Sequence, residues 1–166
     1  MDMVLQGLSD YIEDLCRRHE DVQHSDEECH YVNLNDDKKQ TALAEEMRYP
    51  GVMFSTSGYR FEGSGIDLVK IHSCRLQVWG HCTDTGDYAQ IENILSQANE
   101  ILCDIFAKMV DDKRQRLDTV LNYITLDGVE VQDIQNQSNA LYGCYADFQV
   151  PVRLCVVDRL NKFSEE

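Results

Sequence analysis

Four side chains near the middle of the chain are of the types that bind zinc: His72, Cys74, His81 and Cys82. The pairs His72/Cys74 and His81/Cys82 flank one end of a predicted strand. Structural zinc sites hold four nitrogen and sulfur ligands in a tetrahedron, usually at recurring spacings. The spacing here fits none of the common zinc patterns, and a continuing strand would point His81 and Cys82 to opposite faces. We therefore predict no metal and no cofactor; a small cytosolic metal-binding protein or enzyme that uses this cluster is the alternative.

A second set of possible ligands lies in an acidic stretch, where His24, Cys29 and His30 surround Glu27 and Glu28. Such side chains could bind a divalent ion weakly. A run of mostly like charges is, however, typical of a solvated loop. We therefore assign this stretch to a polar acidic loop region around residues 18–37.

The chain contains none of the common catalytic sequence motifs. It has no Walker-type loop, GxGxxG, HExxH or GxSxG. A nucleophilic cysteine needs an activated thiolate and a base close in space, and no such pair is indicated. The adjacent acids Asp111 and Asp112 fall at a predicted helix end, where we expect both to be solvated. We predict that the protein is not an enzyme.

The elements around these residues give the clearest signals in the sequence. Residues 66–79 predict a strand that stops at Gly80, and apolar residues three and four apart predict an amphipathic helix over residues 87–110. In the strand, the apolar positions change from odd to even near His72, which predicts a β-bulge or burial on both faces. Residues 142–154 alternate regularly as a long strand with one buried face, and at Pro151 the strand is expected to lie at an edge or beyond its pairing.

Weaker patterns complete the order of elements. They predict helices over residues 3–17 and 38–48, strands over residues 30–35, 51–55, from Tyr59, and 117–126, and a polar loop over residues 132–139. The regular βαβ alternation of a parallel sheet is missing. We therefore predict an α+β fold, a mainly antiparallel sheet with the N-terminal helix and the long central helix packed on one face. Ile94 and Phe148 are expected between sheet and helix.

Length and charge limit the possible functions. A chain of 166 residues is expected to form a single domain over residues 1–166. The net charge of −15 repels nucleic-acid phosphates and anionic membranes. Seven cysteines without a CxxC pair indicate a reduced, cytosolic protein, and no signal peptide or membrane span is expected.

Several aromatic residues are candidates for an oligomer interface. Trp79 lies on the odd face of its strand, where it is either exposed on the second face of the sheet or packed under the 83–87 loop. Tyr145 has the same ambiguity, and Tyr59 and Phe61 lie in a glycine-flanked segment. Exposed aromatic side chains often mark protein interfaces.

The layout resembles the tail terminator and tail-completion proteins of long-tailed bacteriophages, and the related head-to-tail connector ring proteins. The matching pieces are the strand end Leu76-Gln77-Val78-Trp79, the helix after it, the N-terminal helix, and the late strand from Leu141 to Val152. The resemblance spans most of the chain as a pattern of elements. Residues 18–49 are longer and more acidic than this family leads us to expect.

The resemblance implies a virion structural protein, made in the host cytoplasm, that forms a homo-oligomeric ring, hexameric or larger. Such a ring joins the tail tube to the head or caps the tube, contacts other tail or neck proteins, and lets DNA pass without tight binding. The acidic balance is compatible with a lumen through which DNA slides. An acidic protein that mimics DNA and inhibits a DNA-binding enzyme is a further alternative.

Overall fold

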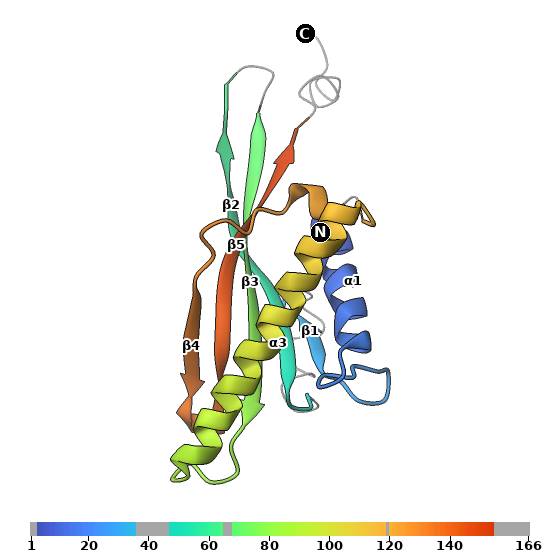
Figure 1. Ribbon diagram of the computed structural model, residues 1–166. Helices are drawn as coiled ribbons and strands as arrows, with labels where there is room; N and C mark the ends of the chain where they lie inside the picture. Colours follow the sequence, from blue (N-terminus) through green and yellow to red (C-terminus); the bar gives the residue numbers. More distant parts are fainter. Residues whose placement is uncertain (1–2, 36–46, 65–67, 119, 155–166) are drawn as a thin grey trace.

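One five-stranded sheet, in the order β1-β2-β3-β5-β4, forms the frame of the molecule (Figure 1). The computed structural model describes residues 3–35, 47–64, 68–118 and 120–154. In this part of the chain the elements are α1 (Met3–Arg18), β1 (Tyr31–Asn33), β2 (Gly51–Glu62), β3 (Val69–His81), α3 (Tyr88–Gln115), β4 (Val131–Asn136) and β5 (Leu141–Arg153), with short 3-10 helices at Val120–Tyr123 and Gln137–Asn139. The predicted α+β fold, with an N-terminal helix and a long second helix, is confirmed.

The sheet is antiparallel except for the parallel pair β1–β2. β3 lies at its centre and pairs with β5 over its whole length, from Val69 opposite Arg153 to His81 opposite Leu141. The late strand predicted over residues 142–154 is thus the inner partner of the central strand. β4 covers only the first half of β5, so Pro151 has no strand on its outer side among the described residues, as the sequence predicts.

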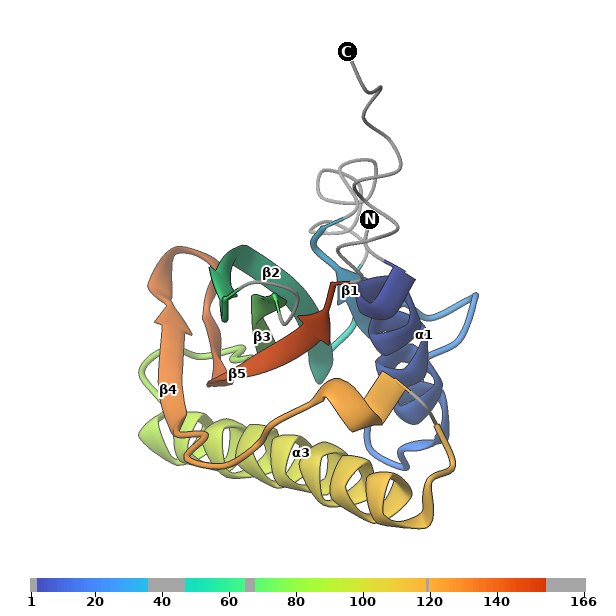
Figure 2. The same cartoon turned by 90° about the horizontal axis from the view of Figure 1, so that it is seen from above.

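Both helices contribute to one hydrophobic core on one face of the sheet, and Figure 2 shows α3 lying beneath the strands with α1 beside β1. The period of the apolar residues explains the contact, since the buried positions of α3 recur three and four apart: Ala98, Ile101, Leu102, Ile105 and Met109. The Phe106 ring meets the ring of Phe148 edge to face at 5.9 Å. Phe148 is therefore buried as predicted.

Ile94 lies nearer the edge of this core and is only partly buried. Its side chain covers Gly80, where an added Cβ would lie 2.5 Å from Ile94 Cγ2. At the glycine that ends the predicted strand, α3 therefore lies against β3 with no room for a side chain between them. α3 begins after Asp87, which accepts a 3.1 Å hydrogen bond from the backbone of Gln90, and ends at Arg116 with φ 57°.

The change of apolar face in β3 has a different origin from a bulge in that strand. The β3–β5 register is continuous, and Ile71 and His72 are both buried, so β3 is covered on both faces at this point. A register shift does occur, but in β2 between Thr56 and Gly58. As a result, even-numbered residues of β2 face the core before the shift, and odd-numbered residues face that side after it.

Three local predictions differ from the structure. The segments predicted as separate strands at residues 51–55 and from Tyr59 are one strand, β2. The described residues of the segment 117–126 contain a 3-10 helix at Val120–Tyr123 instead of a strand, and the side chains of Leu121 and Ile124, three positions apart, are both buried. The predicted polar loop over residues 132–139 is largely the edge strand β4.

The helix predicted over residues 38–48 falls almost entirely outside the described residues. The strand predicted over residues 30–35 is confirmed as β1. Within the described residues, no helix has the length and apolar character needed to cross a lipid bilayer.

Candidate interaction surface

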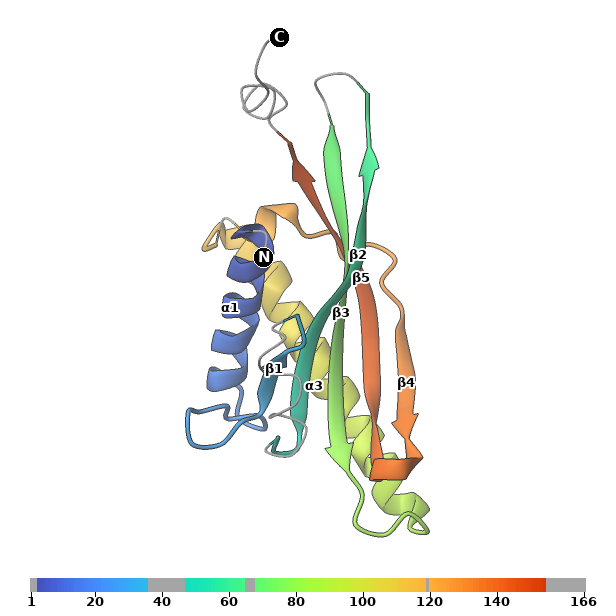
Figure 3. The same ribbon diagram turned by 180° about the vertical axis from the view of Figure 1, so that it is seen from behind.

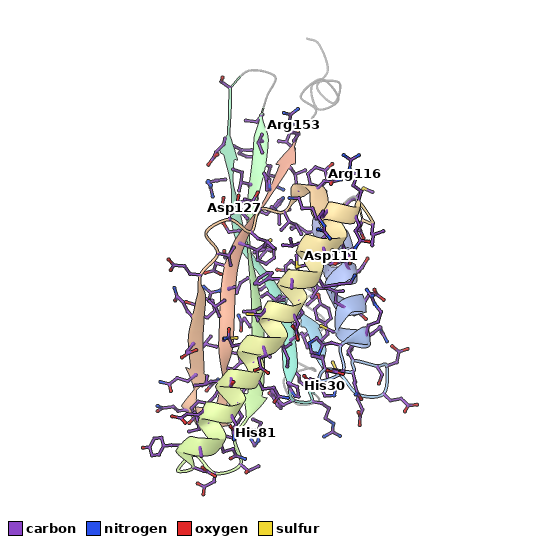
Figure 4. All side chains as sticks on the ribbon, in the orientation of Figure 1. His30, His81, Asp111, Arg116, Asp127 and Arg153 are labelled. Carbon is purple, nitrogen blue, oxygen red and sulfur yellow. The ribbon has the colours of Figure 1, made fainter. Side chains whose placement is uncertain are left out.

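The four candidate zinc ligands lie at two ends of β3. His72 and Cys74 are near Val69, whereas His81 is the last residue of the strand. At about 3.3 Å per residue, roughly 30 Å separates His72 from His81. Figure 4 shows the same separation, with His81 at one end of the sheet and Arg153, the partner of Val69, at the other. The prediction that the two pairs flank one strand end is wrong, and these side chains cannot bind one ion together.

The cysteines of the sheet are buried core residues. Cys74 and Cys144 lie in the core, and burial raises the pKa of each thiol to about 12. At neutral pH both are therefore thiols, without the thiolate that nucleophilic catalysis requires. Cys82 is also buried, and its Sγ contacts the backbone oxygen of Asp84 at 3.0 Å and Gln90 Oε1 at 2.9 Å. Cys82 thus ties the loop after β3 to the first turn of α3.

The histidines of the acidic loop bind neighbouring protein groups. His24 Nδ1 accepts a 3.1 Å hydrogen bond from the backbone N–H of His30, and His24 Nε2 lies 3.4 Å from Glu13 Oε1. Burial, followed by the nearby Arg17 charge, lowers the pKa of His24. His30 Nδ1 lies 2.8 Å from the carbonyl oxygen of Pro50. Across the described residues, no group of three or more His, Cys, Asp or Glu side chains is arranged to hold a metal ion.

Asp112 is a buried carboxylate, whereas we expected it to be solvated at the end of the helix. Only 4% of it is exposed, and it accepts hydrogen bonds from Tyr11 Oη at 2.8 Å and from Lys108 Nζ at 2.5 Å. The Lys108 ammonium is the main cause that holds the pKa of this carboxyl below its usual range. Its position was detectable, because Asp112 lies three residues after Met109 and continues the buried stripe of α3.

Trp79 is buried, which excludes the first of its two alternatives, exposure on the second face of the sheet. It is 7% exposed, and its cross-strand partners are Gly51 and Gly143, which leave space beside the indole. Its Nε1 donates a 2.8 Å hydrogen bond to Gln77 Oε1. A Cβ on Gly51 would collide with the side chain of Met47, so Met47 covers this part of the second face.

Tyr145 is half-buried on that second face. The guanidinium of Arg75 lies 4.1 Å from the centre of the Tyr145 ring and forms a two-point ion pair with Asp147 at 2.7 and 2.8 Å. The Tyr145 hydroxyl donates a 2.6 Å hydrogen bond to Gln132. The ring is thus engaged within the sheet and offers little free apolar surface.

Tyr59 and Phe61 are the two interface candidates with exposed side chains, at 59% and 54%. They lie on the hairpin arm, which we define as residues 57–62 of β2 and 69–73 of β3. The arm extends past the ends of both helices (Figures 1 and 3). The two rings meet at 5.5 Å, and Lys70 Nζ lies 4.3 Å from the centre of the Tyr59 ring.

The sheet has two uncovered edges in the described part of the chain. β1 pairs only with Val52, Met53 and Phe54, so the outer side of the arm segment 57–62 has no strand beside it. β4 is the last strand on the opposite side of the sheet. An uncovered edge presents backbone N–H and C=O groups that can pair with another chain, and β4 has neither the lysine nor the proline that often protects such edges.

A groove of about 460 Å³ runs between the N-terminal half of α3 and β4. Apolar side chains of the helix form one wall, and side chains of the sheet form the other. Six of the residues that line the groove are Tyr88, Ile91, Leu95, Asp133, Gln135 and Tyr142. Tyr88 is 79% exposed at the mouth. No sequence pattern predicts this α3–β4 groove, because residues 131–136 show no apolar alternation.

Within the described residues, an uncovered arm with two exposed aromatic rings and a second uncovered edge beside an apolar groove are features often found where proteins bind one another. No model of a known protein family matches the chain, and no curated protein matches it in sequence.

Proposed function

We propose that this chain is a non-enzymatic structural subunit that assembles with copies of itself into a ring, hexameric or larger, at the head–tail junction or the end of the tail tube of a long-tailed bacteriophage. The observation that carries the proposal is the hairpin arm. Tyr59 and Phe61 together leave an apolar surface in water, at one end of a sheet whose edge is uncovered there among the described residues. Such a surface is stabilised when another subunit covers it.

The distribution of charge supports a ring through which DNA moves. The chain carries 30 acidic and 15 basic residues, so a lumen formed by its surface repels phosphate groups. DNA then passes without tight binding, and other tail or neck proteins are the lasting partners. The order of elements that resembles tail terminators is the second support.

The test is the oligomeric state of the full chain, measured by multi-angle light scattering from about 50 mM to about 1 M salt, alone and with tail-tube or connector protein. We expect monomers at low salt, because subunits of charge −15 repel one another. High salt or the partner protein is expected to produce closed rings, visible by electron microscopy. A chain that remains monomeric under every condition, with no ring in micrographs, would exclude the proposal.

A further inference from the structure

We propose that the hairpin arm of one protomer lies along β4 of the next protomer and places Tyr59 and Phe61 in the α3–β4 groove, so that a second copy of this chain occupies the groove. This inference rests on the proposed ring function and names the two surfaces that form the ring. A ring needs heterologous contacts, in which each subunit offers two different patches. The arm and the groove are two such patches, at opposite ends and opposite edges of one sheet (Figures 1 and 3).

The backbone of both patches is suited to strand pairing. The arm segment 57–62 and β4 are each paired on one side and uncovered on the other, within the described residues. Joining them continues the sheet from one copy into the next, which satisfies backbone groups on both edges. The register shift after Thr56 matters here, because it sets the side of the sheet toward which the arm's aromatic rings point.

In this arrangement the aromatic rings of the arm lie on the same side of the sheet as the groove. After the shift, Tyr59 is opposite His72 and Phe61 is opposite Lys70, on the face that carries the core residues of β3. In a sheet that continues between copies with its helices on one side, both rings project toward the helix layer. The groove opens on that same side, since it lies between α3 and β4.

The charges of the two patches are complementary, although the whole chain is acidic. The arm carries two basic residues, Arg60 and Lys70, and one acidic residue, Glu62, which lies 2.8 Å from Arg60. The segments that flank the groove, 83–100 and 127–136, hold seven acidic residues and no basic one: Asp84, Asp87, Glu92, Glu100, Asp127, Glu130 and Asp133. Copies that repel elsewhere are therefore attracted at this contact, and this steers the arm to the groove.

Two variants test the arm and the groove one at a time, and neither changes a residue of the hydrophobic core. The arm variant is Tyr59→Ala/Phe61→Ala. The groove variant is Asp133→Lys/Gln135→Lys, which places two cations where Lys70 of the neighbouring copy would lie; both residues are exposed and line the groove. Tyr123→Ala is the matched control, since Tyr123 is also an exposed tyrosine but lies outside both patches. Thermal melts of all variants establish that each one folds.

Native mass spectrometry then measures assembly. Each variant alone is expected to need at least tenfold higher concentration than wild type to form rings, whereas Tyr123→Ala assembles like wild type. An equimolar mixture of the arm and groove variants is expected to form 1:1 heterodimers, because one intact groove meets one intact arm. A photo-crosslinking phenylalanine analogue at position 61 of the otherwise wild-type chain is expected to crosslink to residues 85–95 or 131–137 of another copy, which tests the contact without the arm variant.

The outcomes distinguish this inference from the proposed function. Rings that form while the mixture gives no heterodimer, or while crosslinks fall elsewhere, overturn the arm–groove contact and leave the ring intact. Heterodimers from the mixture with open filaments from wild type support the contact and exclude the ring. A wild-type chain that is monomeric in every condition overturns both.

Discussion

The hydroxyl of Tyr11 donates a 2.8 Å hydrogen bond to Asp112 Oδ2 and thereby joins α1 to the last turns of α3, 101 positions later in the chain. Burial, followed by this hydrogen bond, raises the pKa of Tyr11. Lys108, and after it the same bond from Tyr11, lower the pKa of Asp112. At neutral pH Tyr11 is therefore a neutral phenol that donates to an ionised Asp112 carboxylate.

Removing this bond is expected to weaken the contact between the helices. Tyr11→Phe should lower the free energy of unfolding by about 1–2 kcal/mol, because it leaves part of the Asp112 carboxylate without a donor. Urea unfolding of Tyr11→Phe, Asp112→Asn and the double variant measures the coupling between the two residues. Tyr123→Phe, at an exposed tyrosine, serves as the control and should change little. Additive effects of the two single changes would show that the bond contributes nothing.

The ring of Phe148 should dominate the stability of the contact between α3 and the sheet. It is 3% exposed and meets Phe106, so Phe148→Ala is expected to cost about 3–5 kcal/mol. Phe61→Ala, the same substitution at an exposed ring, should leave the melting temperature of the monomer nearly unchanged. Equal melting temperatures for the two variants would contradict the placement of Phe148 in the core.

Gly143 should tolerate no side chain. A Cβ at this position would collide with the carbonyl oxygen of Val78, which belongs to the backbone of the central strand. Gly143→Ala is therefore expected to cost at least about 2 kcal/mol, because strand β5 must move away from β3. At Gly86, the nearest atom to an added Cβ is the side-chain oxygen of Asp84 at 3.2 Å, so Gly86→Ala is the control. Denaturant melts of both variants provide the comparison.

The stability of the protein should fall in mild acid through His24. Burial and the Arg17 charge lower its pKa in the folded state from the ordinary value of 6.5. The unfolded chain therefore binds the proton more readily, so this contribution to stability is present above pH 6.5 and is lost as the pH falls through the folded-state pKa. Protonation of Nδ1 would also remove the hydrogen bond from the His30 N–H.

His24→Asn should reduce this pH dependence, because an amide oxygen can accept the same hydrogen bond without titrating. The measurement is the free energy of unfolding of both proteins between about pH 7.5 and pH 5. Parallel curves for the variant and the wild type would rule out His24 as the source.

Metal content should be below one equivalent. The distance of roughly 30 Å between His72 and His81 prevents them from sharing an ion. Elemental analysis for zinc and iron, on protein purified without a chelator, measures this directly, and Cys74→Ser should leave the result unchanged. A stoichiometric metal that disappears in Cys74→Ser would revive the metal-binding alternative.

Periodicity predicted the elements that are buried on one side only. The helices α1 and α3 and the strand β5 each present one face to the core, and this imposes a repeat that the sequence displays. The signal fails where both faces or neither are covered. Ile71 and His72 are buried on opposite faces of β3, and the residues of β4 are nearly all exposed. An edge strand needs backbone partners more than apolar side chains, so its sequence resembled a loop.

The candidate surface was predictable only in part. Tyr59 and Phe61, which the sequence offered only as possible interface residues, are exposed because the hairpin arm carries them past the helices (Figure 1). The burial of Trp79 depends on its two cross-strand neighbours, Gly51 in β2 and Gly143 in β5, which have no side chains and leave space for the indole. That arrangement follows from the register of the folded sheet, and no local sequence pattern around residue 79 predicts it.

The pairing of β3 with β5 also sets the order in which a nascent chain can fold. β3 ends at His81, and its partner begins at Leu141, with the whole of α3 in between. Ribosomes add about 5–20 residues per second, so roughly 3–12 s pass between the synthesis of the two strands. During this interval the β2–β3 hairpin exists without its inner neighbour, and the edge of β3 is accessible. On a polysome, the same hairpin on the next ribosome presents an equally unpaired edge, and the two edges can pair prematurely.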